Sequence, residues 1–120
     1  MINEYIGVLF LVRDVAHREH LRTTSFAQHM ALGSFYESII ELADTLTEAY
    51  QGRHGIIDDI PILAEDNKSG TPAQRLRKYL KYVEDNRYDA VEKSDTALQN
   101  IIDEIVGLFL STLYKLDNLK

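Results

Sequence analysis

Apolar residues recur every three or four positions along most of the chain, which is the period of an amphipathic α-helix. The pattern predicts four helices, at about residues 3–21, 25–50, 71–86 and 94–117. The first is apolar over most of its circumference, so it is expected to lie centrally or to be shared with a partner subunit. The other three each carry a single apolar stripe, as expected for helices that cover a common core.

Polar and turn-forming residues mark where these helices begin and end. Residues 23–25, Thr-Thr-Ser, interrupt the apolar pattern and offer N-caps for the second helix. Gly52 is expected to end that helix in a left-handed conformation. Thr71 followed by proline is typical of a helix start, and Ser94 or Asp95 is expected to cap the last helix.

The lengths of the connections predict the topology. The first and third are short, so each joins two antiparallel neighbours, whereas the middle one has about twenty residues and can cross the length of the bundle. Residues 1–120 are therefore expected to form one all-α domain, a four-helix bundle with a ferritin-like crossover between helices two and three. A plain up-down bundle with a loose middle loop would give the same pattern. Five apolar residues of this connection are expected to lie against the bundle: Ile56, Ile57, Ile60, Ile62 and Leu63.

Composition narrows the range of functions. The chain has no cysteine, which excludes disulfide scaffolds, cysteine-ligated metal clusters and thiol catalysis. The P-loop, GxGxxG, GxSxG and HExxH motifs are absent, so no catalytic residue is assigned. The longest apolar run, residues 8–12, is far shorter than the roughly 20 residues of a membrane span, and the start of the chain lacks a basic signal region. These features predict a cytoplasmic protein with no membrane partner.

The charge balance argues against a nucleic-acid partner. Thirteen basic and nineteen acidic residues give a formal charge of −6, which repels a phosphate backbone unless basic residues are segregated. One basic cluster is interleaved with tyrosines that could stack on bases, although such tyrosines more often pack their rings and keep the hydroxyl in water. It comprises Arg75, Arg77, Lys78, Tyr79, Lys81, Tyr82, Arg87 and Tyr88.

Histidines and acids along the first two helices are candidate metal ligands. His29, Asp44 and Glu48 lie near the border of the apolar stripe of the second helix, and His17 and His20 lie near the end of the first. Imidazole and carboxylate together suit iron, manganese or zinc. The same residues also fit a simpler arrangement, in which the histidines are hydrogen-bonded within the core and the acids are solvated.

The spacing of His17, His29, Asp44 and Glu48, at intervals of 12, 15 and 4 residues, is similar to that of the ferroxidase ligands in Dps-type mini-ferritins. Residues 16–55 resemble that region without gaps. The resemblance implies a homo-oligomer that binds iron between two subunits, with histidines from one and acids from the other. Gly33 stands where that family has an aspartate, so the resemblance implies a degenerate ferroxidase at most. His20 is an alternative to His17 as the ligand from the first helix.

A closer resemblance is to small Dps-like proteins of tailed bacteriophages, which share the pattern TxSFAQHxALGxFY found at residues 23–36. It implies a phage protein located in the host cytoplasm. Two functions are therefore expected. The first is a small oligomeric Dps-like protein that binds iron. The second is a metal-free acidic helical module that oligomerises and binds a host protein.

Overall fold

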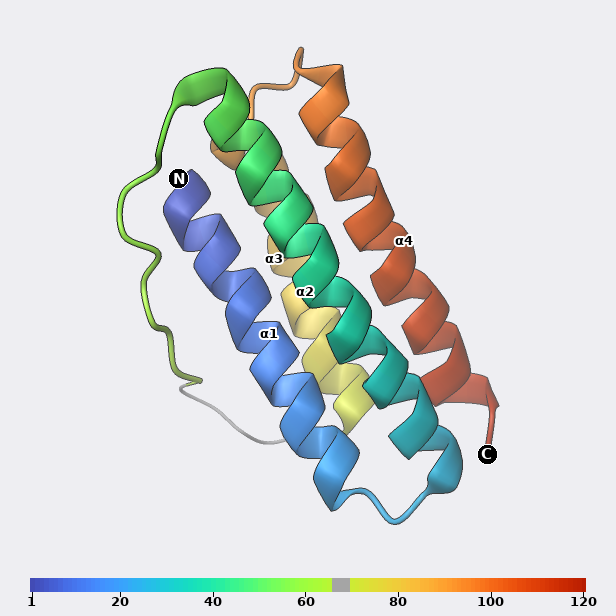
Figure 1. The fold of residues 1–120 in the computed structure, drawn as a ribbon. Coiled ribbons are helices and arrows are strands. Elements are labelled where there is room, and N and C mark those ends of the chain that lie inside the picture. The colour runs from blue at the N-terminus through green and yellow to red at the C-terminus, as the bar shows by residue number, and fades with distance from the viewer. Residues whose placement is uncertain (66–69) are drawn as a thin grey trace.

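The computed structural model describes residues 1–65 and 70–120, and four α-helices are the regular elements of this part of the chain. They are α1 (Ile2–Arg22), α2 (Phe26–His54), α3 (Pro72–Ala90) and α4 (Thr96–Asn118). The helices lie side by side in an elongated bundle with extents of 44 × 26 × 21 Å (Figure 1). The predicted all-α four-helix bundle is confirmed.

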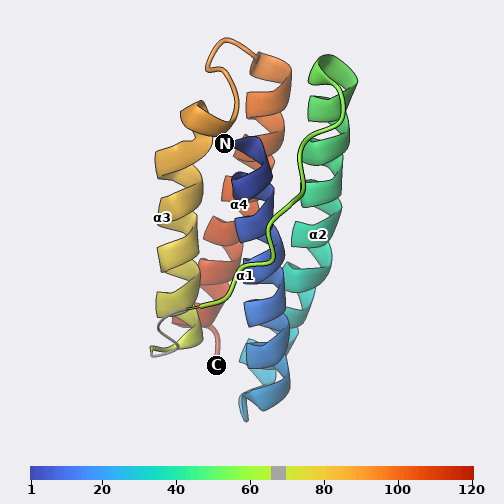
Figure 2. The same ribbon diagram turned by 90° about the vertical axis from the view of Figure 1, so that its left-hand side faces the viewer.

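The long middle connection makes α2 and α3 run in the same direction. α1 and α2 form one antiparallel pair and α3 and α4 form the other, as Figure 1 shows. α1 and α4 each pack against both α2 and α3, so every contacting pair is antiparallel and α2 lies diagonally opposite α3. The described part of the connection, residues 55–65, returns along the outside of α1 (Figure 2). The crossover predicted from loop length is therefore confirmed.

Three of the four helices begin at side-chain caps that the sequence pointed to. The Ser25 hydroxyl accepts a hydrogen bond from the backbone N–H of Gln28 at 3.2 Å, and the Asp95 carboxylate accepts one from Leu98 at 3.2 Å. Thr71 forms a full capping box, in which its hydroxyl and the side chain of Gln74 each bond the other residue's backbone N–H. These caps satisfy donors that the first turn of a helix would otherwise leave unpaired.

Two helix ends differ from the predicted positions. α2 continues through Gly52 to His54, and the left-handed residue is Gly55, with a φ of +90° that suits a residue without a Cβ. The cost of a glycine inside a helix is only about 1 kcal/mol, so Gly52 does not end it. α3 continues beyond residue 86 to Ala90, because its last turn is held by α4: the Gln99 amide donates to the backbone oxygen of Val91 at 3.0 Å.

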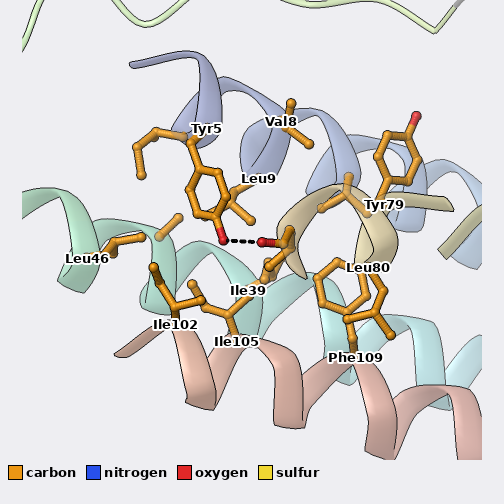
Figure 3. Close-up of a cluster of buried hydrophobic side chains, with 14 of the residues drawn as sticks. Tyr5, Val8, Leu9, Ile39, Leu46, Tyr79, Leu80, Ile102, Ile105 and Phe109 are labelled. Atoms are coloured by element: carbon orange, nitrogen blue, oxygen red, sulfur yellow. Dashed lines mark hydrogen bonds between the residues drawn. The ribbon is translucent and has the colours of Figure 1, made fainter. Parts of the chain in front are cut away.

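The core fills the space between all four helices (Figure 3). Phe35 of α2 and Phe109 of α4 are fully buried and meet edge to face, with ring centroids 5.0 Å apart. Tyr5 of α1 is equally buried, and its hydroxyl donates to the backbone oxygen of Val83 in α3 at 2.8 Å, the dashed contact in Figure 3. Burial raises the pKa of Tyr5 above its usual range, so this hydroxyl stays a hydrogen-bond donor.

The crossover explains why α1 is apolar on two sides. One side faces the core, and the other, which includes Phe10 and Leu11, lines a hollow with Ile60, Pro61 and Leu63. The backbone comes so close that a Cβ at Gly7 would lie 3.0 Å from the Pro61 oxygen. The second apolar side of α1 is thus at least partly covered by this chain itself. Self-association through this side of α1 stays a prediction.

The apolar residues of the crossover divide into two groups. Ile60 and Leu63 pack against the core, and Ile57 is half-buried, as expected. The expectation is wrong for Ile56 and Ile62, whose exposed fractions are 86% and 102%. Residues 55–65 carry no regular secondary structure, so no helical or strand period sets which of their side chains face α1, and Ile56 and Ile62 lie in solvent.

Candidate functional site

The candidate site lies between α1 and α2, close to the short turn that joins them. His17 and His20 belong to the last turns of α1, and His29 belongs to the first turn of α2. All three side chains are half-buried. The Ser25 cap fixes where α2 begins and so sets His29 opposite His20.

His20 and His29 are joined by two reciprocal hydrogen bonds. The Nδ1 of His20 lies 2.6 Å from the backbone oxygen of His29, and the Nδ1 of His29 lies 2.8 Å from the backbone oxygen of His20. A carbonyl oxygen can only accept, so each Nδ1 must carry the proton. The His20 carbonyl is in the last turn of its helix, where carbonyls lack an amide partner, and His29 supplies one.

The two imidazole rings also stack on one another. Their centroids are 3.7 Å apart and their planes are inclined by 18°. Because Nδ1 makes the bond in both residues, Nε2 is the ring nitrogen that these two bonds leave unused. Many metal-bound histidines donate one ring N–H to a carbonyl in the same way and hold the metal with the other nitrogen. The same bonding equally suits a histidine with a purely structural role.

Gly33 provides the space that the His20 ring occupies. A Cβ at position 33 would lie 3.0 Å from Cε1 and 3.1 Å from Nδ1 of His20. An aspartate, the residue that the mini-ferritin pattern has here, would collide with the ring in this arrangement. The departure at Gly33 is therefore matched to the position of His20.

The row of stacked side chains continues along the α1–α2 interface through His17, Tyr36 and Arg13. His17 stacks on Tyr36, with centroids 4.2 Å apart and an interplanar angle of 14°. The Arg13 guanidinium carbon lies 5.4 Å from the Tyr36 centroid, and the His20 ring meets Tyr36 edge-on at 5.3 Å. We call these five residues the histidine ladder: Arg13, His17, His20, His29 and Tyr36.

Sequence reasoning identified the three histidines of the ladder but not the roles of Tyr36 and Arg13. By its spacing, Tyr36 is expected simply to belong to the apolar stripe of the second helix. The spacing of Arg13, His17 and His20, at four and then three residues, places them on one side of α1. That spacing could have identified the row, although it could not have shown that Tyr36 completes it.

Both histidines of α1, His17 and His20, therefore face α2. His20 packs on His29, and His17 packs on Tyr36. Neither ring is left pointing into open solvent, since both are half-buried.

The two candidate acids lie elsewhere. Asp44 and Glu48 are exposed, and they follow His29 by 15 and 19 residues, or about 22 and 28 Å along a helix axis. Across residues 1–65 and 70–120, no group of three or more histidine, aspartate or glutamate side chains is arranged to hold a metal ion. Within one chain, then, the predicted ligands do not converge. A site completed by a second copy is a separate arrangement that a single chain does not test.

Asp103 and Gln99 of α4 are hydrogen-bonded to Arg87 of α3. Asp103 accepts a hydrogen bond from Arg87 at 2.6 Å, and the Gln99 side-chain oxygen accepts another from Arg87 at 2.8 Å. Together they tie α3 to α4 beside the turn between them.

A second polar cluster fastens the end of the crossover to α1 and α3. Arg75 is buried and donates to Glu19 at 2.9 Å and also to Glu65, which accepts a further bond from the Tyr79 hydroxyl. Burial opposes ionisation of Glu65, but the bonds from Tyr79 and Arg75 outweigh it and hold the pKa of Glu65 below its usual range. Burial and the bond to Glu65 raise the pKa of Tyr79.

The basic cluster on α3 is neutralised by nearby acids. Arg75 is paired with Glu19 and Glu65, and each remaining cation of the cluster also lies beside a carboxylate. These ion pairs are Arg77 with Asp117, Lys78 with the same Glu65, Lys81 with Asp85, and Arg87 with Asp103. The paired charges leave little positive field on this face for a phosphate backbone.

None of the four helices combines the length and apolar character that crossing a membrane requires, within the residues that the structure describes.

Comparison with known proteins finds a matching family and a relative from a bacteriophage. A family model described as "Family of unknown function (DUF5856)" matches residues 20–116, a region that includes His20 and His29 but begins after His17. An uncharacterized 14.6 kDa protein of enterobacteria phage T4, from the mobD-ri intergenic region, is 28% identical over 116 residues. The match covers 95% of this chain and 86% of that protein. No solved structure gives a significant match. These findings support the phage part of the resemblance and establish no relationship to Dps-type proteins or ferritins.

Proposed function

The chain belongs to DUF5856, a family of unknown function, and we propose that it is a metal-free helical interaction module that binds another protein. The T4 relative supports a phage origin, and with it a place in the host cytoplasm. The bundle is the rigid support, and its exposed acidic surface is the part that binds. No chemical step is assigned to it.

The observation that carries this proposal is the reciprocal bonding of His20 and His29. Both Nδ1 atoms are used to join α1 to α2, and Gly33 is shaped to the His20 ring. The histidines thus have a complete structural role without a metal. The acids Asp44 and Glu48 are exposed, where they can serve a partner, and neither forms an ion pair within residues 1–65 and 70–120.

Iron held between two copies of the chain is the second candidate. The observation in its favour is that the hydrogen bonds between His20 and His29 use only Nδ1 and leave the Nε2 of each ring outside that pairing. The residues of a single chain do not fit an iron centre, because the acids are about 22 Å or more along α2 from His29. The proposal needs a twofold-related copy to supply Asp44 and Glu48, and ferroxidase activity would be weak at most.

Metal content and unfolding of matched variants distinguish the two candidates. The protein is produced with iron supplied, and bound metal is measured per chain together with native mass. An interaction module contains no stoichiometric iron. In it His29→Ala lowers the free energy of unfolding, and Asp44→Ala leaves that free energy unchanged. An intersubunit iron site instead predicts stoichiometric metal that both variants lose.

Binding to a partner is tested with purified components. Host and phage proteins cross-linked to the tagged chain in infected cells are identified, produced separately and mixed with it. A complex of fixed stoichiometry that survives gel filtration and contains no iron supports the module. A metal-loaded oligomer that binds none of these proteins contradicts it.

A further inference from the structure

We propose that the outward face of α2 docks a basic amphipathic helix of the partner protein, with an apolar anchor at one end of that helix. This inference rests on the proposed function, because it names the surface and the partner chemistry through which the module would act. The surface, which we call the α2 stripe, comprises Phe26, Met30, Glu37, Glu41, Asp44 and Glu48.

The beginning of the α2 stripe is an apolar groove. Phe26 and Met30 are exposed to 77% and 54%, and Leu119, beyond the end of α4, is exposed to 48%. Together with small residues of α2 and with Lys115 of α4 they line a hollow between the start of α2 and the end of α4. A run of exposed large apolar side chains around a hollow is typical of a contact surface, because leaving it in water forfeits the gain from burial. A single apolar side chain of a partner would fit there.

The rest of the α2 stripe is acidic. Glu37, Glu41, Asp44 and Glu48 follow one another at intervals of four, three and four residues. At 100° per residue they fall within a sector of about 60° and extend for about 16 Å. All four are exposed, and none forms an ion pair with another residue in the described part of the chain.

The spacing favours a helix as the occupant. Intervals of four, three and four residues amount to about three helical turns, so the four carboxylates lie along one side of α2, where a second helix laid beside it can reach each of them. Lysine or arginine at the same spacing on a partner helix would face the four carboxylates in turn. The unpaired charge of the α2 stripe therefore specifies a basic partner, and the groove specifies an apolar residue at one end of it.

Charge also argues against a second copy of this chain as the occupant. Two α2 stripes brought together would oppose carboxylates to carboxylates. The basic residues on α3 that could match the stripe are already paired with Asp117, Glu65 and Asp85. Nucleic acids and anionic membranes carry the same sign of charge as the stripe and would be repelled.

The test uses synthetic helical peptides of about 25 residues. The probe has lysines at alternating intervals of three and four and two leucines at one end, and is made with the leucines at either terminus. A scrambled peptide of identical composition is the control. Binding to the full chain is followed by fluorescence anisotropy at low and high salt, and the surface is located from backbone amide shifts by NMR. We expect the better probe to bind at least tenfold more tightly than its scramble, to weaken at least fivefold at high salt, and to shift amides along α2.

Two pairs of matched variants locate the contact. Glu41→Lys with Asp44→Lys should weaken binding at least tenfold, whereas Asp89→Lys with Glu104→Lys, which changes the net charge equally on exposed positions of α3 and α4, should change it less than twofold. Phe26→Ser with Met30→Ser should weaken binding at least fivefold. The apolar control is Leu110→Ser with Tyr114→Ser, on the exposed side shared with α3.

The inference would be overturned if neither probe bound or if the scrambled peptide bound equally well. It would also be overturned if Asp89→Lys with Glu104→Lys weakened binding as much as Glu41→Lys with Asp44→Lys, or if the amide shifts were confined to α3 and α4. A concentration-dependent dimer abolished by Phe26→Ser would identify a second copy as the occupant instead. These results differ from failure of the proposed function, which is stoichiometric iron lost in His29→Ala and Asp44→Ala. If the protein binds its partner through another face, the proposed function stands and only the assignment of the α2 stripe as the docking surface is wrong.

Discussion

His20 and His29 each donate an Nδ1–H to the other's backbone oxygen, at 2.6 and 2.8 Å, while their rings stack at 3.7 Å. The pair joins the last turn of α1 to the first turn of α2. Two of the candidate metal ligands thus hold two helices together through hydrogen bonds and ring stacking. The contribution of this pair to the free energy of unfolding can be measured without knowing any ligand.

Removing either ring should destabilise the protein. His29→Ala leaves the His20 backbone oxygen, in the last turn of α1, without its partner and loses the ring stack. We expect the free energy of unfolding to fall by about 1–3 kcal/mol in urea titrations. The control is His54→Ala at the exposed end of α2, which should change it by less than about 0.5 kcal/mol. Equal effects of the two substitutions would contradict a special role for the pair.

Gly33→Ala should destabilise the protein, against the usual preference for alanine in a helix. Alanine is favoured over glycine by about 1 kcal/mol inside helices. At position 33 the new Cβ would lie 3.0 Å from Cε1 of His20 and displace the ring. Thermal unfolding of Gly33→Ala should therefore show a lower midpoint than the parent chain.

Two further variants make that prediction specific. Gly107→Ala lies in α4 with nothing within 4 Å of its Cβ and should stabilise by about 1 kcal/mol. In a His20→Ala background, Gly33→Ala should become stabilising as well, because the ring it would meet is gone. A Gly33→Ala substitution that is destabilising in both backgrounds would show that the His20 ring is not the cause.

The sequence specified those features that depend on neighbouring residues and helical period. Ser25, Thr71 and Asp95 are caps because each acts on its own helix turn. The length of the middle connection favours the crossover, although a plain up-down bundle with a loose middle loop would give the same pattern. Contacts between helices could not be read in the same way: nothing around Gly33 in the chain shows that His20, thirteen residues earlier, needs its space.

In the candidate site, too, residue types and spacing can be read from the sequence, whereas contacts between helices cannot. The sequence offers His17, His20 and His29 as metal ligands or as hydrogen-bonded core histidines. Within one chain their partners are backbone oxygens and a tyrosine ring, which have no signature in residue spacing. Ile60 and Ile62 are equally apolar in sequence, and only the path of the crossover decides that the first is covered and the second exposed. Whether Asp44 and Glu48 meet histidines of another copy stays a prediction.

Lifting the crossover from α1 should expose it to proteases. Gly7→Leu would place a side chain where the Pro61 backbone and ring now lie, 3.0–3.3 Å from the position of a Cβ. Limited proteolysis should then cut within residues 55–65 at least several times faster than in the parent chain, while the helices remain folded by circular dichroism. The control is Gly52→Ala, whose Cβ meets nothing within 4 Å. An unchanged cleavage rate in Gly7→Leu would mean that this contact does not hold the crossover.

Acid should destabilise the protein partly through Glu65. The bonds from Tyr79 and Arg75 hold its folded-state pKa below the usual 4.5, so the folded protein binds this proton less readily than the unfolded chain. The stabilisation is fully present above about pH 4.5 and is lost as the pH falls through the lower folded-state pKa. Glu65→Gln should lower stability at pH 7 by about 1–3 kcal/mol, and its stability should fall less between pH 5 and pH 3 than that of the parent chain. Glu48→Gln, exposed and without an ion pair in the described residues, should leave both the stability and its slope unchanged. Parallel pH profiles for Glu65→Gln and the parent would show that the link between the crossover, α1 and α3 does not depend on the charge of this carboxylate.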